Sequence, residues 1–343
     1  GSGAKRSYYA LPQSPQTLKQ LLMIGGIDRY YQLVKCFRNE DLRADRQPEF
    51  TQVDCELSFV EQEDVLRIFE GLIHNLFLKF KQVDLPEFVR MSYAEAMQTY
   101  GSDKPDLRWG MPFVDFTPLA KGKEFKVFDE AEAILGICLK KGATLSRKAL
   151  DGLIDFVRRP EVGAKVLVYV KYGADGTLNS SVQKWYSQAC IEGWLKEAGA
   201  EPGDMLLMLS GDKERTRVAL STLRLEVGKR YCSHLADKVI ALWVVDFPLL
   251  AWCEEEGRYH ALHHPFTAPR SEDYGLLASH PSEVRGQSYD MVINGMEVGG
   301  GSIRVHDRTM QLELFKVLGF AEEQAKGKFG FLFEALSYGT PPH

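Results

Sequence analysis

Residues 32–57 combine arginines, carboxylates and aromatic side chains in a spacing that favours a charged, planar ligand. Their pattern predicts two β-strands joined by a charged loop. The first strand ends at Phe37-Arg38, the loop carries Glu40, and the second strand begins at Phe50. A ligand that offers both an anion and a polar planar group, such as a nucleotide, uses both signs of charge at once.

The second strand of this hairpin carries a polar face. Side chains alternate between the two faces of a strand, so Phe50, Gln52, Asp54 and Glu56 share one face. Two interpretations are open at this point. The face lines a ligand site, or it is the solvated side of an ordinary antiparallel sheet.

Further charged residues extend the set beyond the hairpin. The cations are Lys19, Arg38 and Arg304, and the carboxylates are Glu40, Asp54, Asp290 and Glu297. Carboxylate oxygens bind Mg²⁺, and arginines neutralise phosphate charge. Together these residues predict a site for a magnesium-bound polyphosphate.

Three consecutive glycines, 299–301, follow the turn signal Asn294-Gly295 inside an apolar hairpin. Glycine weakens a strand, so the run predicts that some group approaches the backbone closely there. A bulge without function is the alternative. The run lacks the G-K-[ST] ending and the strand–turn–helix setting of a phosphate-binding loop.

Three histidines, His260, His263 and His264, have a spacing that could bind a metal on a helix. Pro265 and the nearby glycine argue against a helix in this stretch. We therefore expect His263 and His264 to contact a ligand instead.

The elements that must position these side chains predict an α+β fold. A helix begins after Ser14-Pro15 and ends before Gly25-Gly26. A long amphipathic helix covers 61–82. The sequence pattern changes at 113–231, where concentrated polar motifs are few. This stretch predicts buried strands at 165–171 and 204–209 and helices at 146–157, 180–198 and 212–227.

Composition narrows the class of protein. The 343 residues suggest two domains, and a net charge of −5 gives no global basic field for nucleic acid. The six cysteines never form a C-x-x-C pair, which favours reduced thiols in a cytoplasmic protein over zinc or disulfides. No run of residues is long and apolar enough to predict a membrane-spanning helix, so we expect no membrane partner.

Phe37-Arg38-Asn39-Glu40, followed by Phe50-Thr51-Gln52-Val53-Asp54, resembles the second signature motif of class II aminoacyl-tRNA synthetases. Five further segments resemble bacterial-type aspartyl-tRNA synthetases: 9–16, 43–50, 101–106, 263–266 and 299–304. The resemblance covers nearly the whole chain. It implies a class II antiparallel sheet flanked by helices, built from 1–112 and 232–343, with an inserted α+β domain of the GAD type at 113–231.

The resemblance also implies roles for single residues. Arg38 would be the catalytic group, and ATP would be bound by Arg38, Glu40, Phe50, Glu297 and His263. Aspartate would be bound by Ser14, Gln16, Lys19, Gln52, Asp54, His264 and Arg304, and Mg²⁺ by Asp290 and Glu297. Lys19 and Arg304 would pair with the side-chain carboxylate and so select against asparagine.

The implied activity is that of an aspartate–tRNA ligase of protein biosynthesis. It would activate L-aspartate with ATP and transfer it to the 3′ end of a tRNA, either that for aspartate alone or also that for asparagine. The full-length protein would be a cytoplasmic homodimer.

Four parts of the family have no match in the chain: the anticodon-binding β-barrel, the first and third signature motifs, and the mobile loop over the amino acid. We therefore expect a fragment. One alternative is a paralogue that makes asparagine, which the insertion and the loop at 43–47 disfavour. Another is a synthetase-derived interaction module, which the intact set of Arg38, Glu40, Asp290, Glu297 and Arg304 disfavours. A catalytically incompetent fragment stays open, because the first and third signature motifs are missing.

Overall fold

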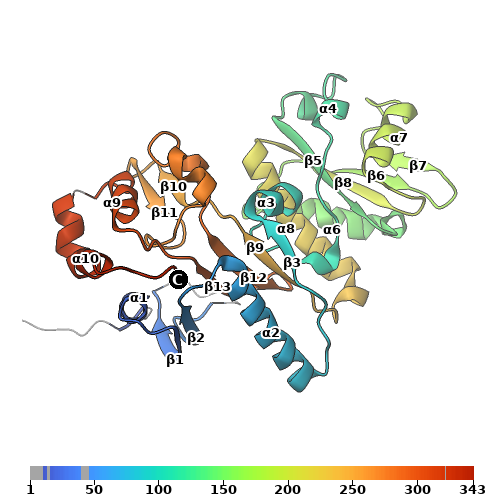
Figure 1. The fold of residues 1–343 in the computed structure, drawn as a ribbon. Coiled ribbons are helices and arrows are strands. Elements are labelled where there is room, and N and C mark those ends of the chain that lie inside the picture. The colour runs from blue at the N-terminus through green and yellow to red at the C-terminus, as the bar shows by residue number, and fades with distance from the viewer. Residues whose placement is uncertain (1–10, 14–15, 40–45, 321) are drawn as a thin grey trace, which may run out of the picture. The chain divides into compact units, whose positions relative to one another are not determined.

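The computed structural model describes residues 11–13, 16–39, 46–320 and 322–343 (Figure 1). Ser14 and Glu40, both predicted site residues, lie outside the described residues. The chain divides into two compact units. The first unit comprises the described residues up to Asp84, together with Val245–Asp290 and Gly299–His343, and the second comprises Leu85–Val244 and Met291–Val298.

The first unit begins with a helix and a hairpin, as the sequence predicts. Helix α1 (Gln16–Ile24) precedes β1 (Arg29–Phe37) and β2 (Glu49–Leu57). The two strands are antiparallel, and Arg29 is opposite Leu57 while Phe37 is opposite Glu49. Helix α2 (Gln62–Lys81) follows, and its apolar stripe is present but largely exposed, with Leu66 its buried member.

The remaining elements of the first unit surround an apolar core. They are β10 (Leu250–Cys253), β11 (Arg258–Ala261), η4 (Ser271–Leu276), η5 (Pro281–Glu283), α9 (Arg308–Val317) and α10 (Glu322–Leu336). Phe266, Phe315 and Phe333 are central to that core. The core therefore supports the segment just after β11, which carries His263 and His264.

A four-stranded sheet has the order β13-β12-β9-β3. Its strands are β3 (Val89–Ser92), β9 (Ala241–Val245), β12 (Ser288–Ile293) and β13 (Met296–Ser302). Asn294 and Gly295 join β12 to β13 with φ of 52° and 80°. Positive φ at both positions is the geometry that an Asn-Gly hairpin turn requires, which confirms the predicted turn.

The second unit is built around a five-stranded antiparallel sheet of order β4-β5-β8-β6-β7 (Figure 1). The strands are β4 (Val114–Asp115), β5 (Ala133–Leu139), β6 (Val168–Tyr172), β7 (Leu178–Ser180) and β8 (Met205–Gly211). Alternate residues of β5 and β8 enter two different cores. Because both faces are covered by apolar packing, these strands read as continuous apolar runs in the sequence.

Helices cover the two faces of this sheet. One core includes α6 (Arg147–Val157) and α8 (Lys213–Tyr231), and the other includes α4 (Thr117–Ala120), α5 (Lys126–Asp129) and α7 (Gln188–Glu197). The unit also contains α3 (Tyr93–Tyr100), η1 (Leu107–Trp109), η2 (Gly142–Thr144) and η3 (Ser233–Leu235).

The predicted elements of 113–231 are present, but two of them begin clearly later than predicted. The strand predicted at 165–171 begins at Val168. The helix predicted at 180–198 begins only at Gln188, because the Ser187 side chain caps it by accepting from the Cys190 backbone N–H. The second unit contains all of 113–231, and the GAD-type insertion stays a prediction. Among the described residues, we find no helix with the length and apolar character needed to span a bilayer.

Candidate active site

The polar face of β2 is the buried face. Asp54 is 7% exposed and Glu56 is 6% exposed, whereas Val53 on the opposite face is 50% exposed. An ordinary amphipathic strand would show the reverse burial. The interpretation of this face as a solvated sheet surface is therefore wrong, and its carboxylates must have partners inside the protein.

Helix α1 supplies the first of these partners. Gln16, Lys19 and Gln20 are spaced three and four residues apart, so they share one face of the helix, and all three are buried. The Lys19 Nζ atom lies 2.6 Å from Asp54 Oδ1 and 3.1 Å from Glu56 Oε2. The lysine thus joins both buried carboxylates of β2.

Arg304, which follows β13, supplies the second cation. Its Nε lies 3.4 Å from Glu56 Oε1, and its Nη2 donates to Gln16 Oε1 at 2.7 Å. Its Nη1 donates to Ser302 Oγ at 2.7 Å, and its backbone N–H donates to the His343 carbonyl. These contacts bring together three predicted aspartate ligands, Gln16, Lys19 and Arg304, in one buried cluster.

Several buried polar atoms around this cluster have no hydrogen-bond partner among the described residues, including both amide atoms of Gln20 and two atoms that face the charged groups. The latter two are Asp54 Oδ2, an acceptor, and Gln16 Nε2, a donor. An unsatisfied buried polar atom costs about 1–3 kcal/mol and is uncommon in folded proteins. The pair complements a ligand that carries an ammonium group and a carboxylate.

His264 lies beside the two cations and is held neutral. Its Nδ1 accepts a hydrogen bond from the Phe266 backbone N–H at 3.2 Å. Burial, together with the positive charges of Arg304 and Lys19, lowers the pKa of His264 to about 3. The imidazole therefore adds no third positive charge at neutral pH.

This low pKa predicts a stability that depends on pH. The folded pKa of about 3 lies below the usual 6.5 of histidine, so the unfolded chain binds the proton more tightly. Stability from His264 is present above pH 6.5 and is lost as the pH falls toward 3, at up to about 1.4 kcal/mol per pH unit. We expect His264→Asn to flatten the fall in unfolding free energy between pH 6.5 and 5, measured by denaturant titration.

A residual slope is expected in that variant, because burial also lowers the pKa of His343. Equal slopes for His264→Asn and the wild-type protein would contradict the role of His264.

His263 has different neighbours from His264. Its Nε2 lies 3.6 Å from Asp290 Oδ1, and its ring packs edge-on against Phe247 with the centroids 4.5 Å apart. Phe247 follows Asp246, which has a left-handed backbone with φ of 59°. Sequence reasoning gave Phe247 no role, since nothing in its neighbourhood along the chain points to His263.

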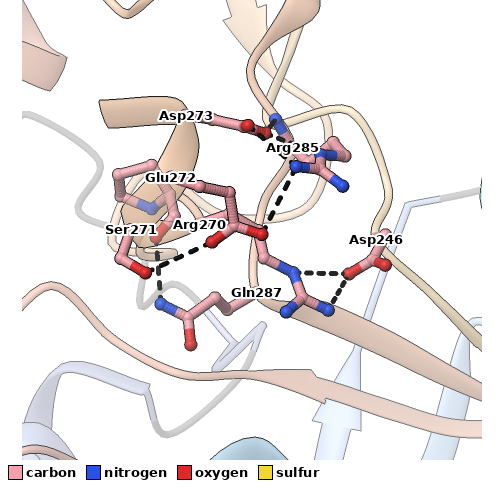
Figure 2. Close-up of polar contacts among 8 residues, drawn as sticks. Asp246, Arg270, Ser271, Glu272, Asp273, Arg285 and Gln287 are labelled. Carbon is pink, nitrogen blue, oxygen red and sulfur yellow. Dashed lines mark hydrogen bonds and ion pairs between the residues drawn. The ribbon is translucent and has the colours of Figure 1, made fainter. Parts of the chain in front are cut away.

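Two arginine–aspartate pairs, Arg270–Asp246 and Arg285–Asp273, lie in the same part of the first unit (Figure 2). Arg270 donates to Asp246 Oδ1 through Nε and Nη2. Arg285 donates to the Asp273 carboxylate through Nε at 2.7 Å and through Nη2 at 2.8 Å. The Arg285 hydrogen bond lowers the pKa of Asp273 below its usual value. The first pair fixes the turn at Asp246, and with it the ring that His263 packs against.

The third histidine belongs to another group. His260, Cys253 and Glu256 offer ligand atoms within 4.8 Å of one another on the β10–β11 hairpin. The Glu256 carboxylate already pairs with Arg258 Nη2 at 2.6 Å. His260 lies in strand β11, and His263 and His264 follow that strand, so the three do not share a helix. This agrees with the expectation drawn from Pro265.

The glycine run in β13 has a local cause. A Cβ atom built on Gly300 would overlap the Asp290 Oδ1 atom and approach the Tyr289 carbonyl oxygen. The group that approaches the backbone is therefore the protein's own carboxylate, and the bulge alternative is not needed. Asp290 is in the first unit and Glu297 is in the second, so their joint use of one metal ion stays a prediction.

The hairpin also carries two of the predicted ATP-binding residues, Arg38 and Phe50. The Arg38 guanidinium carbon lies 5.1 Å from the centroid of the Phe50 ring, at cation–π distance. The Arg38 backbone N–H donates to the Pro48 carbonyl at 2.8 Å. Gln52 Oε1 accepts from Cys36 Sγ across the strand pair at 3.4 Å. Arg38 and Phe50 are thus close together, as the sequence predicts for one binding surface.

Comparison with known proteins adds to this geometry. The model of the family "tRNA synthetases class II (D, K and N)" matches residues 2–343. Aspartate–tRNA ligase of Flavobacterium psychrophilum is 55% identical over 336 residues, and that of Parabacteroides distasonis is 57% identical over 338. Each alignment covers 98% of this chain and 58% of the relative, so the chain spans under two thirds of their length.

One solved structure, an aspartyl tRNA synthetase from Entamoeba histolytica, overlaps with a TM-score of 0.42 and 14% identity. The overlap covers 96% of this chain and 45% of that one.

Proposed function

Because this chain belongs to the class II tRNA synthetases (D, K and N), we propose that it carries the amino-acid activation site of an aspartate–tRNA ligase. The observation that carries the proposal is the buried cluster of Lys19, Arg304, Asp54 and Gln16, with its two unpartnered polar atoms. The similar proteins named above are aspartate–tRNA ligases, which agrees with the proposal.

Aspartate has three charged groups, and the cluster offers a partner for each kind of charge. Asp54 Oδ2 is an acceptor for the α-ammonium group, and Ser14, outside the described residues, would assist it. Arg304 and Lys19 would receive the side-chain carboxylate. His264, which is neutral, and Gln52 would complete the amino-acid contacts by hydrogen bonding.

ATP would bind along the hairpin. Phe50 offers an aromatic face to adenine, and Arg38 a positive charge to the α-phosphate. Glu40 would accept from the adenine amino group, and His263 would lie near the phosphates. The aspartate α-carboxylate oxygen then bonds to the α-phosphorus as the bond to pyrophosphate breaks. No proton needs to move, so positioning and charge stabilisation carry the rate.

Mg²⁺ fits the donors that the chain offers for it. Asp290 and Glu297 present carboxylate oxygens, the donors that Mg²⁺ prefers. When bound, the ion would neutralise phosphate charge as pyrophosphate leaves. The Asp290 side chain lies against Gly300, where no Cβ intervenes, and this contact supports the proposal.

Because of this contact, we expect alanine substitutions at Gly300 and at the neighbouring Gly299 to have very different effects on the exchange rate. Gly300→Ala should push the Asp290 carboxylate aside and lower the rate of aspartate-dependent ATP–pyrophosphate exchange by about tenfold or more, the cost of misplacing a charge-stabilising group. Gly299→Ala is the matched control, because a Cβ there meets no atom within 4 Å. Equal rates in the two variants would contradict the role of Asp290.

In the second step, a terminal hydroxyl of tRNA would attack the aspartyl carbonyl carbon, and AMP would leave. The tRNA would be that for aspartate, or those for aspartate and asparagine. We further propose a homodimer and a cytoplasmic location for the intact protein, and a GAD-type insertion domain at 113–231.

Aspartate-dependent ATP–pyrophosphate exchange by the intact protein tests the proposal. We expect exchange with aspartate and far slower exchange with asparagine. No exchange with aspartate, or equal exchange with asparagine, would reject it. Retained binding of a partner protein without exchange would instead support the interaction module.

A further inference from the structure

The Glu56 carboxylate bridges the two cations of the amino-acid cluster. Oε2 lies 3.1 Å from Lys19 Nζ, and Oε1 lies 3.4 Å from Arg304 Nε. Glu56 is 6% exposed, and both cations are nearly as buried. The residue comes from the face of β2 that also presents Asp54, so the strand itself sets its position.

The charges of the cluster cancel. Lys19 and Arg304 are positive, and Asp54 and Glu56 are negative. A buried cation without a counter-charge is strongly destabilising. Glu56 removes that cost when no amino acid is bound, because each of its oxygens serves one cation.

The same contacts affect selectivity between aspartate and asparagine. If Glu56 stays between Lys19 and Arg304, a neutral amide in the site does not leave these cations unpaired. An incoming carboxylate must also compete with Glu56 for them. The two cations alone would therefore discriminate more strongly than the bridged pair does.

We propose that Glu56 is a specificity-determining counter-ion of this pocket. It stabilises the pocket without ligand and sets how strongly an acidic side chain is preferred to its neutral amide. The selectivity part rests on the proposed function, whereas the stabilising part does not.

Glu56→Gln removes the negative charge and keeps the shape. We expect the ratio of the asparagine to the aspartate dissociation constant to rise by about tenfold, a typical coupling between charges a few ångströms apart in a partly screened site. The variant should also unfold at a lower temperature, because an amide offers one acceptor where the carboxylate offers two.

The experiment is calorimetric titration of aspartate and asparagine into the intact wild-type protein and its variants. Glu256→Gln is the matched control, because that glutamate also contacts two basic groups, Arg258 and His260, but on the surface. Its ratio should equal that of the wild type. An unchanged or smaller ratio in folded Glu56→Gln would overturn the proposal.

A second variant keeps the stabilising part testable. Glu56→Ala deletes the carboxylate, and acetate supplied in the buffer should restore its melting temperature, while Glu256→Ala should show no such recovery. Absence of rescue would overturn the counter-ion role even if Glu56→Gln did not fold. Failure of the wild-type protein to bind aspartate would reject the proposed function, and the rescue by acetate would still test the counter-ion.

Discussion

Arg304→Leu is expected to abolish measurable aspartate binding while leaving ATP binding within about twofold of the wild type. Arg304 is buried and donates to Glu56, Gln16 and Ser302, so its loss removes a cation and the groups it positions. Truncating one partner of a buried charge pair costs about 3–5 kcal/mol, which corresponds to a loss in affinity of more than a hundredfold. ATP contacts are proposed at Arg38 and Phe50, which do not depend on Arg304.

Separate calorimetric titrations of the intact protein with aspartate and with ATP measure the two effects. Arg308→Leu is the matched control, since Arg308 is exposed four residues further along the chain. Arg304→Lys should also bind poorly, because a single ammonium group cannot reach all three acceptors of the guanidinium. An aspartate affinity unchanged in Arg304→Leu would refute the assigned role.

Arg224→Leu should strongly destabilise the second unit. Arg224 is 1% exposed and donates to the backbone carbonyls of Asp106, Gly110 and Met111. Its guanidinium also lies 4.5 Å from the centroid of the Tyr100 ring. Burial lowers the pKa of Arg224 to about 10, so the side chain remains charged at neutral pH.

Leucine at position 224 would leave these carbonyl oxygens unpaired in an apolar setting. Each unpaired buried acceptor costs about 1–3 kcal/mol, so we expect a loss of about 3–5 kcal/mol in the unfolding free energy. Urea titration with far-UV circular dichroism measures it. Arg215→Leu, an exposed position on the same helix, should change stability by less than about 0.5 kcal/mol. A similarly small effect of Arg224→Leu would show that the carbonyls find other partners.

Local spacing predicted the hairpin and its faces correctly. Strand alternation is a property of neighbouring residues, so Asp54 and Glu56 could be placed together from the sequence. The Asn294-Gly295 turn was equally local, because both residues tolerate positive φ. The sequence predicted close approach at the glycine run, although not that the approaching atom belongs to Asp290.

Contacts between distant segments escaped this reasoning. Glu56 and Arg304 are 248 positions apart, and no periodicity links them. Resemblance to a family gave Lys19 and Arg304 a common ligand but left Glu56 without a role. The contact of Phe247 with His263 depends on a left-handed backbone at Asp246. An aspartate in the sequence does not by itself predict that backbone conformation.

The strand order of the second unit has a consequence for solubility. Its apolar strand β8 lies inside the sheet, paired with β5 along one edge and with β6 at residues 205–208 of the other. The rim strands β4 and β7 have only two and three residues, and β4 pairs with β5 only at Leu135 and Gly136. Once the sheet has formed, β8 is therefore shielded from intermolecular β-pairing, whereas the rim beside β4 depends on the short length of its exposed edge.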